Sequence, residues 1–354
     1  IITPKQKQLF STGFQYRLSK KIKIESEIAL STNDLNTFSS IDNQDNNGLA
    51  ERTKIIHSSV LGDSSKGWEI ENKVEFEYLH ANFLPIEQYR SVEFDRDWNT
   101  RNKGFQGQQL FGIISSKIKQ KSYGYINLAG QSYAIGSNYL GNRAYSDGVW
   151  KQKGWAATWN GSYLASNSTG ANQFLRHRVD INKKIGSIKI GFKDDFEKNT
   201  FRDTTQQITK NSYQFFDYEA YVASADTSKT YLKFYYRERY DQRADSLRLR
   251  AVAKATTIGG QVSLKKLKDQ ELTIIGGYRS LRISDSTLIN QTPENLLIGR
   301  IEYEARWFKN ALNWSTFYEI GSGLEQKRTF IYIKVNDGQG VYTWIDYNGD
   351  GVKD

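Results

Sequence analysis

The amino-acid sequence predicts an all-β protein, an antiparallel transmembrane β-barrel of about 16 or more strands built from consecutive hairpins. Three observations lead to this prediction. Apolar and polar residues alternate along many segments, proline is almost absent, and short connections take turns with longer ones. In a membrane barrel only every second residue of a strand meets lipid, so alternation is the pattern that such a strand requires.

The clearest alternation runs from Trp68 to Tyr78, which reads WEIENKVEFEY. Mostly apolar residues fall on one face, and four Glu with one Lys fall on the other, because successive side chains of a strand point in opposite directions. About eleven residues is also the length that a tilted strand needs to cross a bilayer. At helical spacing the same charges would surround the whole cylinder, so a strand is the better interpretation.

The alternation recurs in at least four other segments. Their apolar faces consist of Phe10, Thr12, Phe14, Tyr16 and Leu18; Ile22, Ile24, Ser26, Ile28 and Leu30; Leu297, Ile301, Tyr303, Ala305 and Trp307; and Leu312, Trp314, Thr316, Tyr318 and Ile320. Two further apolar faces are interrupted by a charge, at Asp194 and at Glu238. In the segments 50–61 and 247–264 the pattern does not say which face is apolar.

Two kinds of connection alternate between the expected strands. The short ones, most with Lys, are Ser19-Lys20, Gly62 to Lys66, Lys119 to Lys121, Lys151 to Gly154, Lys183 to Ile185, Ser224 to Lys229, Lys265 to Asp269 and Phe308 to Asn310. The long ones, rich in Asn, Asp, Ser and Thr, are 32–49, 80–106, 136–142, 166–172, 198–211, 242–246, 283–295 and 323–328. This asymmetry is typical of barrels with tight periplasmic turns and longer outer loops. We expect eight hairpins, a seventeenth strand near 329–335, barrel hairpins over 1–335 and a separate extension over 336–354.

Composition supports long strands and limits the chemistry. The chain has 3 Pro against 22 Tyr and 18 Phe, and it has no Cys, which excludes disulfides and Cys-based metal sites. The net charge of +10 is spread along the chain without a basic block, so nucleic acid is not an expected partner. The mean hydropathy is −0.66. No apolar run approaches the ~20 residues of a membrane-spanning helix.

A soluble β-sandwich or an extended antiparallel sheet is the main alternative fold. Its strands also alternate, because one face packs on a core. Strand length, loop asymmetry and the uniform polarity of the second face favour the membrane barrel, since sandwich strands average about five or six residues.

The sharpest motif is DYNGDGVKD at residues 346–354. Oxygen-bearing groups alternate and a Gly follows the third of them, as in the first part of an EF-hand-type calcium loop. The candidate ligands are Asp346, Asn348, Asp350, the backbone carbonyl of Val352, and Asp354. The acid that closes such a loop would fall after Asp354. The alternative interpretation is a surface turn rich in Asn and Asp.

A second cluster of charges lies in the segment YRSVEFDRDWN at residues 89–99. Paired carboxylates can carry out acid–base catalysis in glycosidases. Here the acids alternate with Arg, which holds carboxylates ionised. We therefore interpret the segment as an ion-pair network that stabilises a loop, and we expect no enzymatic activity.

The alternating aromatic strands, the Lys-bearing turns, YRSVEFDRDWN and YTWIDYNGDGVKD resemble large outer-membrane barrel proteins of the Bacteroidota. The resemblance implies location in the outer membrane of a Gram-negative bacterium and contact with the lipid bilayer and lipopolysaccharide. It also implies outer-membrane lipoproteins or other barrel subunits as partners, and a chain that is part of a larger barrel. Such barrels import glycans, secrete proteins or anchor surface complexes. The sequence shows no TonB box and no plug-domain signature.

We thus expect a non-catalytic component for transport, secretion or the support of a surface complex. The lumen of this barrel would be lined by Glu69, Glu71, Glu75, Glu77, Arg300, Glu302, Glu304 and Arg306. The alternative function is a soluble, calcium-dependent extracellular binding module or adhesin. Partition into detergent distinguishes the two.

Overall fold

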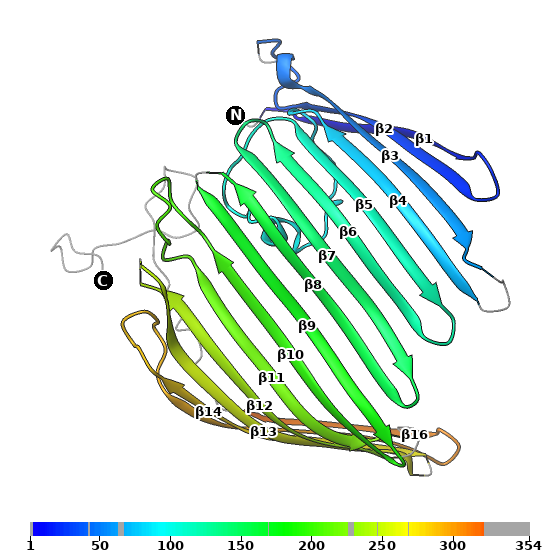
Figure 1. The fold of residues 1–354 in the computed structure, drawn as a ribbon, viewed down its shortest axis with the longest axis vertical. Coiled ribbons are helices and arrows are strands. Elements are labelled where there is room, and N and C mark those ends of the chain that lie inside the picture. The colour runs from blue at the N-terminus through cyan, green and yellow to red at the C-terminus, as the bar shows by residue number, and fades with distance from the viewer. Residues whose placement is uncertain are drawn as a thin grey trace. The chain divides into compact units, whose positions relative to one another are not determined.

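The computed structural model describes residues 3–321, except 42, 63–66, 169, 226–229, 246 and 268 and the side chains of 266 and 267. These residues belong to one unit of the chain. They form a single sheet of 16 antiparallel strands, paired in the order in which they occur in the sequence (Figure 1). The prediction of an all-β chain of consecutive hairpins is confirmed.

The strands are all long, from 10 to 19 residues. They are β1 (Gln6–Arg17), β2 (Ile22–Asp34), β3 (Asn47–Val60), β4 (Trp68–Leu79), β5 (Gln109–Gln120), β6 (Gly124–Ile135), β7 (Tyr139–Gln152), β8 (Trp155–Asn167), β9 (Ala171–Ile185), β10 (Ile188–Thr200), β11 (Tyr213–Ser224), β12 (Thr230–Ala244), β13 (Leu249–Leu267), β14 (Gln270–Ile283), β15 (Glu294–Trp307) and β16 (Leu312–Gly321). The described helices are the short η1 (Asn43–Asp45) and α1 (Phe94–Asp97). Neither is long and apolar enough to cross a membrane.

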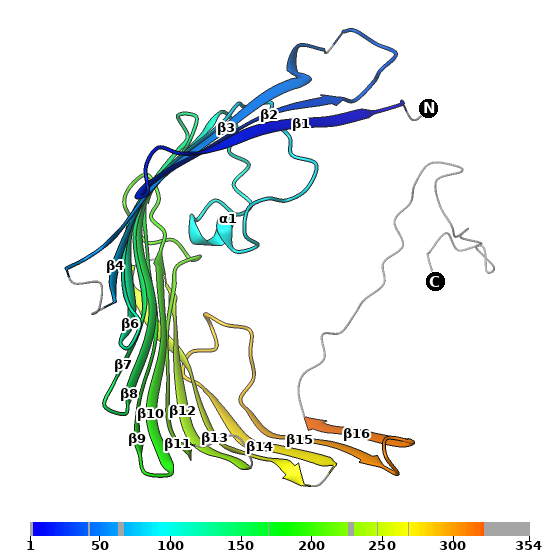
Figure 2. The same cartoon turned by 90° about the vertical axis from the view of Figure 1, so that its right-hand side faces the viewer.

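The sheet bends strongly, and α1 lies in its hollow (Figure 2). We call the face that carries α1 the inner face and the opposite one the outer face. Across β2 to β5 one inner row runs from Glu27 through Arg52 and Glu77 to Phe111. On the outer face of β4, Phe76 is 46% exposed. The predicted alternation of this segment is therefore confirmed, with its Glu residues inside.

The edges of the described sheet are β1 and β16, each paired with one neighbour. A twisted meander of long antiparallel strands is the arrangement from which large β-barrels are built. The expected seventeenth strand near 329–335, the extension over 336–354 and the candidate calcium ligands lie outside the described residues.

The described short connections, such as Lys153-Gly154 between β7 and β8, are tight turns at one edge of the sheet (Figure 1). Lys153 and Gly154 both have positive φ, 46° and 81°. Positive φ at both central residues is the mark of a type I′ hairpin turn, whose twist matches that of the strands.

The turn predicted over Lys183 to Ile185 is wrong, because β9 continues to Ile185 and the turn is Gly186-Ser187. Two expected long loops are also wrong. The connections predicted over 136–142 and 166–172 are only three residues long, because β7 begins at Tyr139, β8 continues to Asn167 and β9 begins at Ala171.

The irregular segments also have physical explanations. Asp194 and Glu238 do lie on the outer face, both opposite Tyr218, so each charge interrupts the apolar face of its own strand without a shift of the strand register. In β13, Ala251 and Ala253 pair with consecutive residues of β12, which leaves Val252 as a bulge. A bulge exchanges the faces of the residues before and after it. This explains why the pattern of 247–264 was ambiguous.

Candidate functional site

The longest connection in the described part of the chain is residues 80–108, between β4 and β5. It folds back over the inner face of the sheet and carries α1 (Figure 2). We call it the inner loop. Its central turn is closed by backbone hydrogen bonds, from Asp97 N to Glu93 O at 2.8 Å and from Thr100 N to Asp95 O at 2.8 Å. This turn points consecutive side chains toward different strands.

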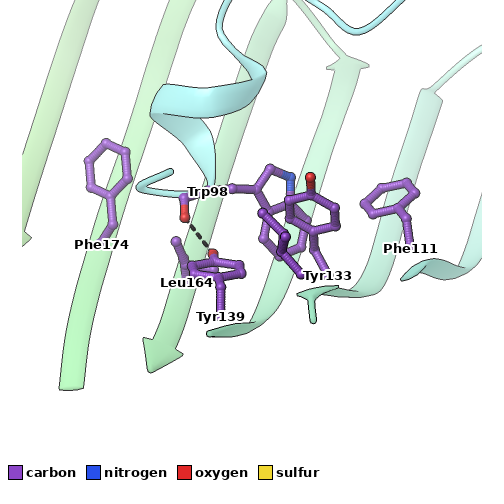
Figure 3. Close-up of a cluster of buried hydrophobic side chains, with 7 residues drawn as sticks. Trp98, Phe111, Tyr133, Tyr139, Leu164 and Phe174 are labelled. Carbon is purple, nitrogen blue, oxygen red and sulfur yellow. Dashed lines mark hydrogen bonds between the residues drawn. The ribbon is translucent and has the colours of Figure 1, made fainter. Parts of the chain in front are cut away.

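Trp98 is the apolar anchor of the inner loop and is only 1% exposed. Its ring centroid lies 5.4 Å from that of Tyr133 and 5.7 Å from that of Phe111, both nearly edge-on. Phe94 of the loop packs against the same two rings, at 5.2 and 5.9 Å. The buried cluster consists of Trp98, Phe111, Tyr133, Ile135, Tyr139, Leu164 and Phe174 (Figure 3). Aromatic pairs in this geometry stabilise beyond the area they bury.

The strand beneath Trp98 is shaped to receive it. The Tyr139 hydroxyl donates a hydrogen bond to the Trp98 carbonyl (Figure 3). A Cβ atom added to Gly141 would meet the Tyr139 side chain first and would also lie 3.1 Å from Trp98 Cε3, which is tighter than ordinary contact. Gly141 therefore leaves room for the indole. Tyr139, the first residue of β7, and Gly141 both contribute to the binding of Trp98.

Arg96 ties the inner loop to β10. Its Nη2 atom lies 2.5 Å from both carboxylate oxygens of Glu197, which is buried. A second hydrogen bond, to Glu93 at 3.1 Å, holds the guanidinium from the loop side. Burial lowers the pKa of Arg96, but the hydrogen bonds to these two carboxylates outweigh it and raise the pKa above its usual range. Arg96 is therefore charged at every physiological pH.

Asp97 ties the inner loop to β9 and β7. Its carboxylate lies 2.7 Å from Arg176 and 3.3 Å from Arg143. Arg143 is buried and Arg176 largely so, and both also contact the Ser162 hydroxyl, at 3.2 and 3.3 Å. One loop carboxylate thus compensates two guanidinium groups that would otherwise face each other without a counter-ion.

Asn99 completes the attachment through a reciprocal amide pair. Its side chain donates to Asn199 at 3.1 Å and accepts from it at 2.8 Å, and both residues are buried. Asn99 has φ of 55°, a left-handed conformation that Asn tolerates better than most residues. Four consecutive residues, 96–99, therefore reach strands β5, β6, β7, β9 and β10.

The entry to the inner loop is fixed by Arg90 and Tyr89. Arg90 forms an ion pair with the buried Glu77 at the end of β4, and its guanidinium lies 4.3 Å from the Phe94 ring centroid. The Tyr89 hydroxyl also lies within 3.5 Å of Glu77. Burial raises the pKa of Tyr89 to about 12. The segment 89–99 therefore is an ion-pair network, and most of the partners are on strands that the loop sequence alone does not reveal.

On the opposite, outer face a shallow hollow of 640 Å³ lies over the small residues Gly130, Ala144 and Gly161. Its rim includes Ile114 and Leu175, which lie in the same outward-facing row as Ala144. Because most of the lining residues face outward and most of these are apolar, this hollow belongs to the apolar face and is not part of a polar path under the inner loop.

The residues predicted to line a lumen all lie on the inner face, where several of them form ion pairs with side chains of opposite charge. Glu75 lies 2.5 Å from Arg52 and 3.1 Å from Lys73, Glu69 lies 3.4 Å from Lys119, and Arg300 pairs with Glu302. The basic partners Arg52, Arg143 and Arg176 were not singled out from the sequence. The sequence signal that could have identified these Arg residues is the alternation. Each stands between residues of the outer face of its strand, and therefore points to the other face.

The described residues contain no group of three or more His, Cys, Asp or Glu that could hold a metal ion. The predicted calcium loop lies outside them and stays a prediction. No protein-family model matches the sequence. No curated protein matches it either, so the function is argued from the geometry of the sheet and the inner loop.

Proposed function

We propose that this chain forms part of the wall of an outer-membrane β-barrel in which the inner loop narrows a polar passage. Its role would be passive, in transport, secretion or the support of a surface complex, without covalent chemistry. The bilayer and lipopolysaccharide would surround its outer face. The observation that carries the proposal is the opposite character of the two faces of one long-stranded sheet.

The outer face suits lipid. On it Ile114 is 69% exposed, Phe10 65% and Ile28 47%, on three different strands. Soluble monomers rarely expose continuous apolar patches larger than a few hundred Å². From β4 to β8, which are described completely, no Asp, Glu, Lys or Arg faces outward. A surface of this kind is stable against acyl chains and unstable in water.

The inner face suits water and a charged cargo or counter-ion. Its Glu and Arg residues pair across strands, as Arg237 does with Asp217 at 2.5 Å and Lys54 with Glu25 at 2.7 Å. Rings of charged side chains set the selectivity of pores. The inner loop adds Arg96 and Asp97 to this surface and is anchored firmly enough to hold a fixed constriction.

Insertion is tested by placing one charge on each face of β4. Phe76→Arg puts a guanidinium on the outer face, where a mid-bilayer charge destabilises by about 2–4 kcal/mol. We expect a large loss of heat-modifiable, folded protein in the membrane fraction. The matched control is Glu71→Arg, which is exposed on the inner face of the same strand and should assemble normally.

Two outcomes contradict the proposal. Equal assembly of the two variants would show that the outer face does not meet lipid. A native chain that stays monomeric and dissolved without detergent would favour the soluble binding module instead.

A further inference from the structure

The outer face of β9 to β13 carries a group of polar side chains in the midst of apolar ones. We call this group the outer polar band. It consists of His177, Asp194, Tyr218, Tyr236, Glu238, Tyr240, Lys254 and Thr256. The outer faces of β4 to β8 hold no Asp, Glu, Lys or Arg, whereas β14 adds Arg282 opposite Lys254 of the band.

The band follows the strand register. Asp194 lies opposite Tyr218, Tyr218 opposite Glu238, and Glu238 opposite Thr256, one row across β10 to β13. Asp194 is six residues from either end of β10. In the proposed barrel this row lies near mid-bilayer, where ionisable groups are expensive and are usually associated with function.

One end of the band is compensated from within the chain. The Glu238 carboxylate lies 2.7 Å from Lys254 Nζ. It also accepts hydrogen bonds from the hydroxyls of Tyr218 at 2.6 Å, Tyr236 at 2.5 Å and Tyr240 at 2.5 Å. Such a network stays together in a medium of low dielectric, because each polar atom has a partner.

The other end is not fully compensated. His177 Nδ1 lies 3.3 Å from Asp194 Oδ1. Both atoms are buried, and neither has a hydrogen-bond partner in the part of the chain that the structure describes. The imidazole stacks on Phe196, with ring centroids 5.1 Å apart. The Asp194 side chain remains 19% exposed toward the outer face, so an outside group can reach it.

We infer that the outer polar band is the contact surface for a second membrane-embedded protein that presents hydrogen-bond donors, a Lys or Arg side chain above all, at the same depth. This inference rests on the proposed function. Arg282 of β14 lies opposite Lys254 at the Glu238 end of the band. Positive charge is therefore missing at the other end, where Asp194 has no Lys or Arg partner among the described residues and has unused acceptor capacity. A basic partner supplies the missing charge, and apolar surroundings strengthen the interaction.

A second copy of this chain fits less well. In a two-fold contact the same patch faces itself. With the axis at Tyr218, Asp194 of one copy would face Glu238 of the other, because these residues flank Tyr218 in the row. Two carboxylates in contact repel each other, so we commit to a different, donor-bearing protein.

The chain has no Cys, so single cysteines report on one position each. Ala220→Cys places a thiol on the exposed outer face of β11, opposite Tyr236 of the band. Ala144→Cys is the matched control, exposed on the outer face of β7. Each variant is labelled with a lipid-soluble maleimide, first in isolated outer membranes and then as purified protein in phosphatidylcholine vesicles.

We expect Ala220→Cys to react roughly tenfold more slowly in native membranes than in vesicles, since the core of an interface excludes its surroundings. Ala144→Cys should react equally in both. Adding Asp194→Asn to Ala220→Cys should restore fast labelling in native membranes, while heat-modifiable mobility shows that the variant is folded.

Three results would overturn the inference. Equal labelling of Ala220→Cys in both settings means that lipid covers the band. Protection that survives Asp194→Asn means that the band does not recognise the partner. A disulfide between two Ala220→Cys chains means that the occupant is a second copy. Absence of the native chain from the membrane fraction would instead overturn the proposed function.

Discussion

Charged side chains are buried on both faces of this sheet, yet the two faces compensate them differently. On the inner face, the guanidinium groups of Arg143 and Arg176 meet Asp97, and Glu197 meets Arg96. On the outer face, His177 and Asp194 face each other without a completed hydrogen bond. Inside, the inner loop supplies the counter-charges. Outside, the described chain supplies no such loop, and in our inference the missing groups come from another protein.

The difference shows on which face the chain itself compensates its buried charges. An unpaired buried charge destabilises a protein strongly, whereas a paired one is close to neutral. The inner face should therefore lose stability when its pairs are broken. Replacement of Asp194 should not lower the stability of the purified protein. Its effect should appear only in the native membrane, as a loss of contact with the partner.

The largest effect is expected for the apolar anchor of the inner face. Trp98→Ala removes a fully buried indole and should destabilise the attachment of the inner loop by about 3–5 kcal/mol. Because the strands keep their own ladders, the loop should detach while the sheet persists. Limited proteolysis of folded protein, read as cleavage within residues 80–108, measures this release.

Val92→Ala is the control for that release, since Val92 belongs to the same loop and is 85% exposed. It should leave the cleavage rate unchanged. If both variants are cleaved as slowly as the native protein, Trp98 is not the residue that holds the inner loop on the inner face.

The second effect concerns the shared carboxylate. Asp97→Asn keeps the shape of the side chain but removes the charge that compensates Arg143 and Arg176, and we expect a loss of about 1–3 kcal/mol in the free energy of unfolding. Urea unfolding in lipid vesicles gives the value. A variant as stable as the native protein would mean that the two guanidinium groups need no counter-ion from the loop.

The third effect compares two ion pairs of the inner face. Arg96 with Glu197 joins the loop to a buried carboxylate, whereas Arg178 with Asp195 joins two neighbouring strands, with the Arg side chain 74% exposed. Double-mutant cycles to Ala should give a coupling of about 1 kcal/mol for the first pair and about 0.3 kcal/mol for the second. The reverse order would remove the distinction between loop attachment and surface pairing.

Loss of Arg96 should also change the passage. If the inner loop narrows a pore, Arg96→Ala should increase single-channel conductance in a planar bilayer, and Arg178→Ala should alter it much less. Equal conductance of the native protein and both variants would show that the inner loop does not restrict the flow of ions.

Much of the fold was accessible from the sequence because a strand has a period of two. In β4 that period placed Phe76 on one face and Glu77 on the other without knowledge of any neighbour. Consecutive pairing followed from tight turns such as Lys153-Gly154. The inward path of the inner loop was not accessible, because Asp97 and Arg176 are 79 residues apart and charge alone does not say which strand a loop will reach.

The outer polar band was visible in the sequence only as irregularity. Asp194 and Glu238 each broke an apolar face, and a one-residue slip of register would have turned either of them inward. Only the observed pairing of Asp194 with Tyr218, and of Tyr218 with Glu238, shows that the charges stay outside and form one row. Pairing between strands is a tertiary property, and alternation within one strand carries no information about it.

The smallest expected effect is the sharpest test of the comparison. Asp194→Asn should leave the free energy of unfolding of the purified protein in vesicles unchanged or raise it by about 1 kcal/mol, because a neutral amide is less costly to hold against lipid than a carboxylate. Asp97→Asn, the same substitution on the inner face, should lower it. A loss of stability for Asp97→Asn without a loss for Asp194→Asn would show that the chain compensates charge on its inner face and leaves Asp194 uncompensated on the outer one. Equal losses would mean that Asp194 is already compensated within the chain.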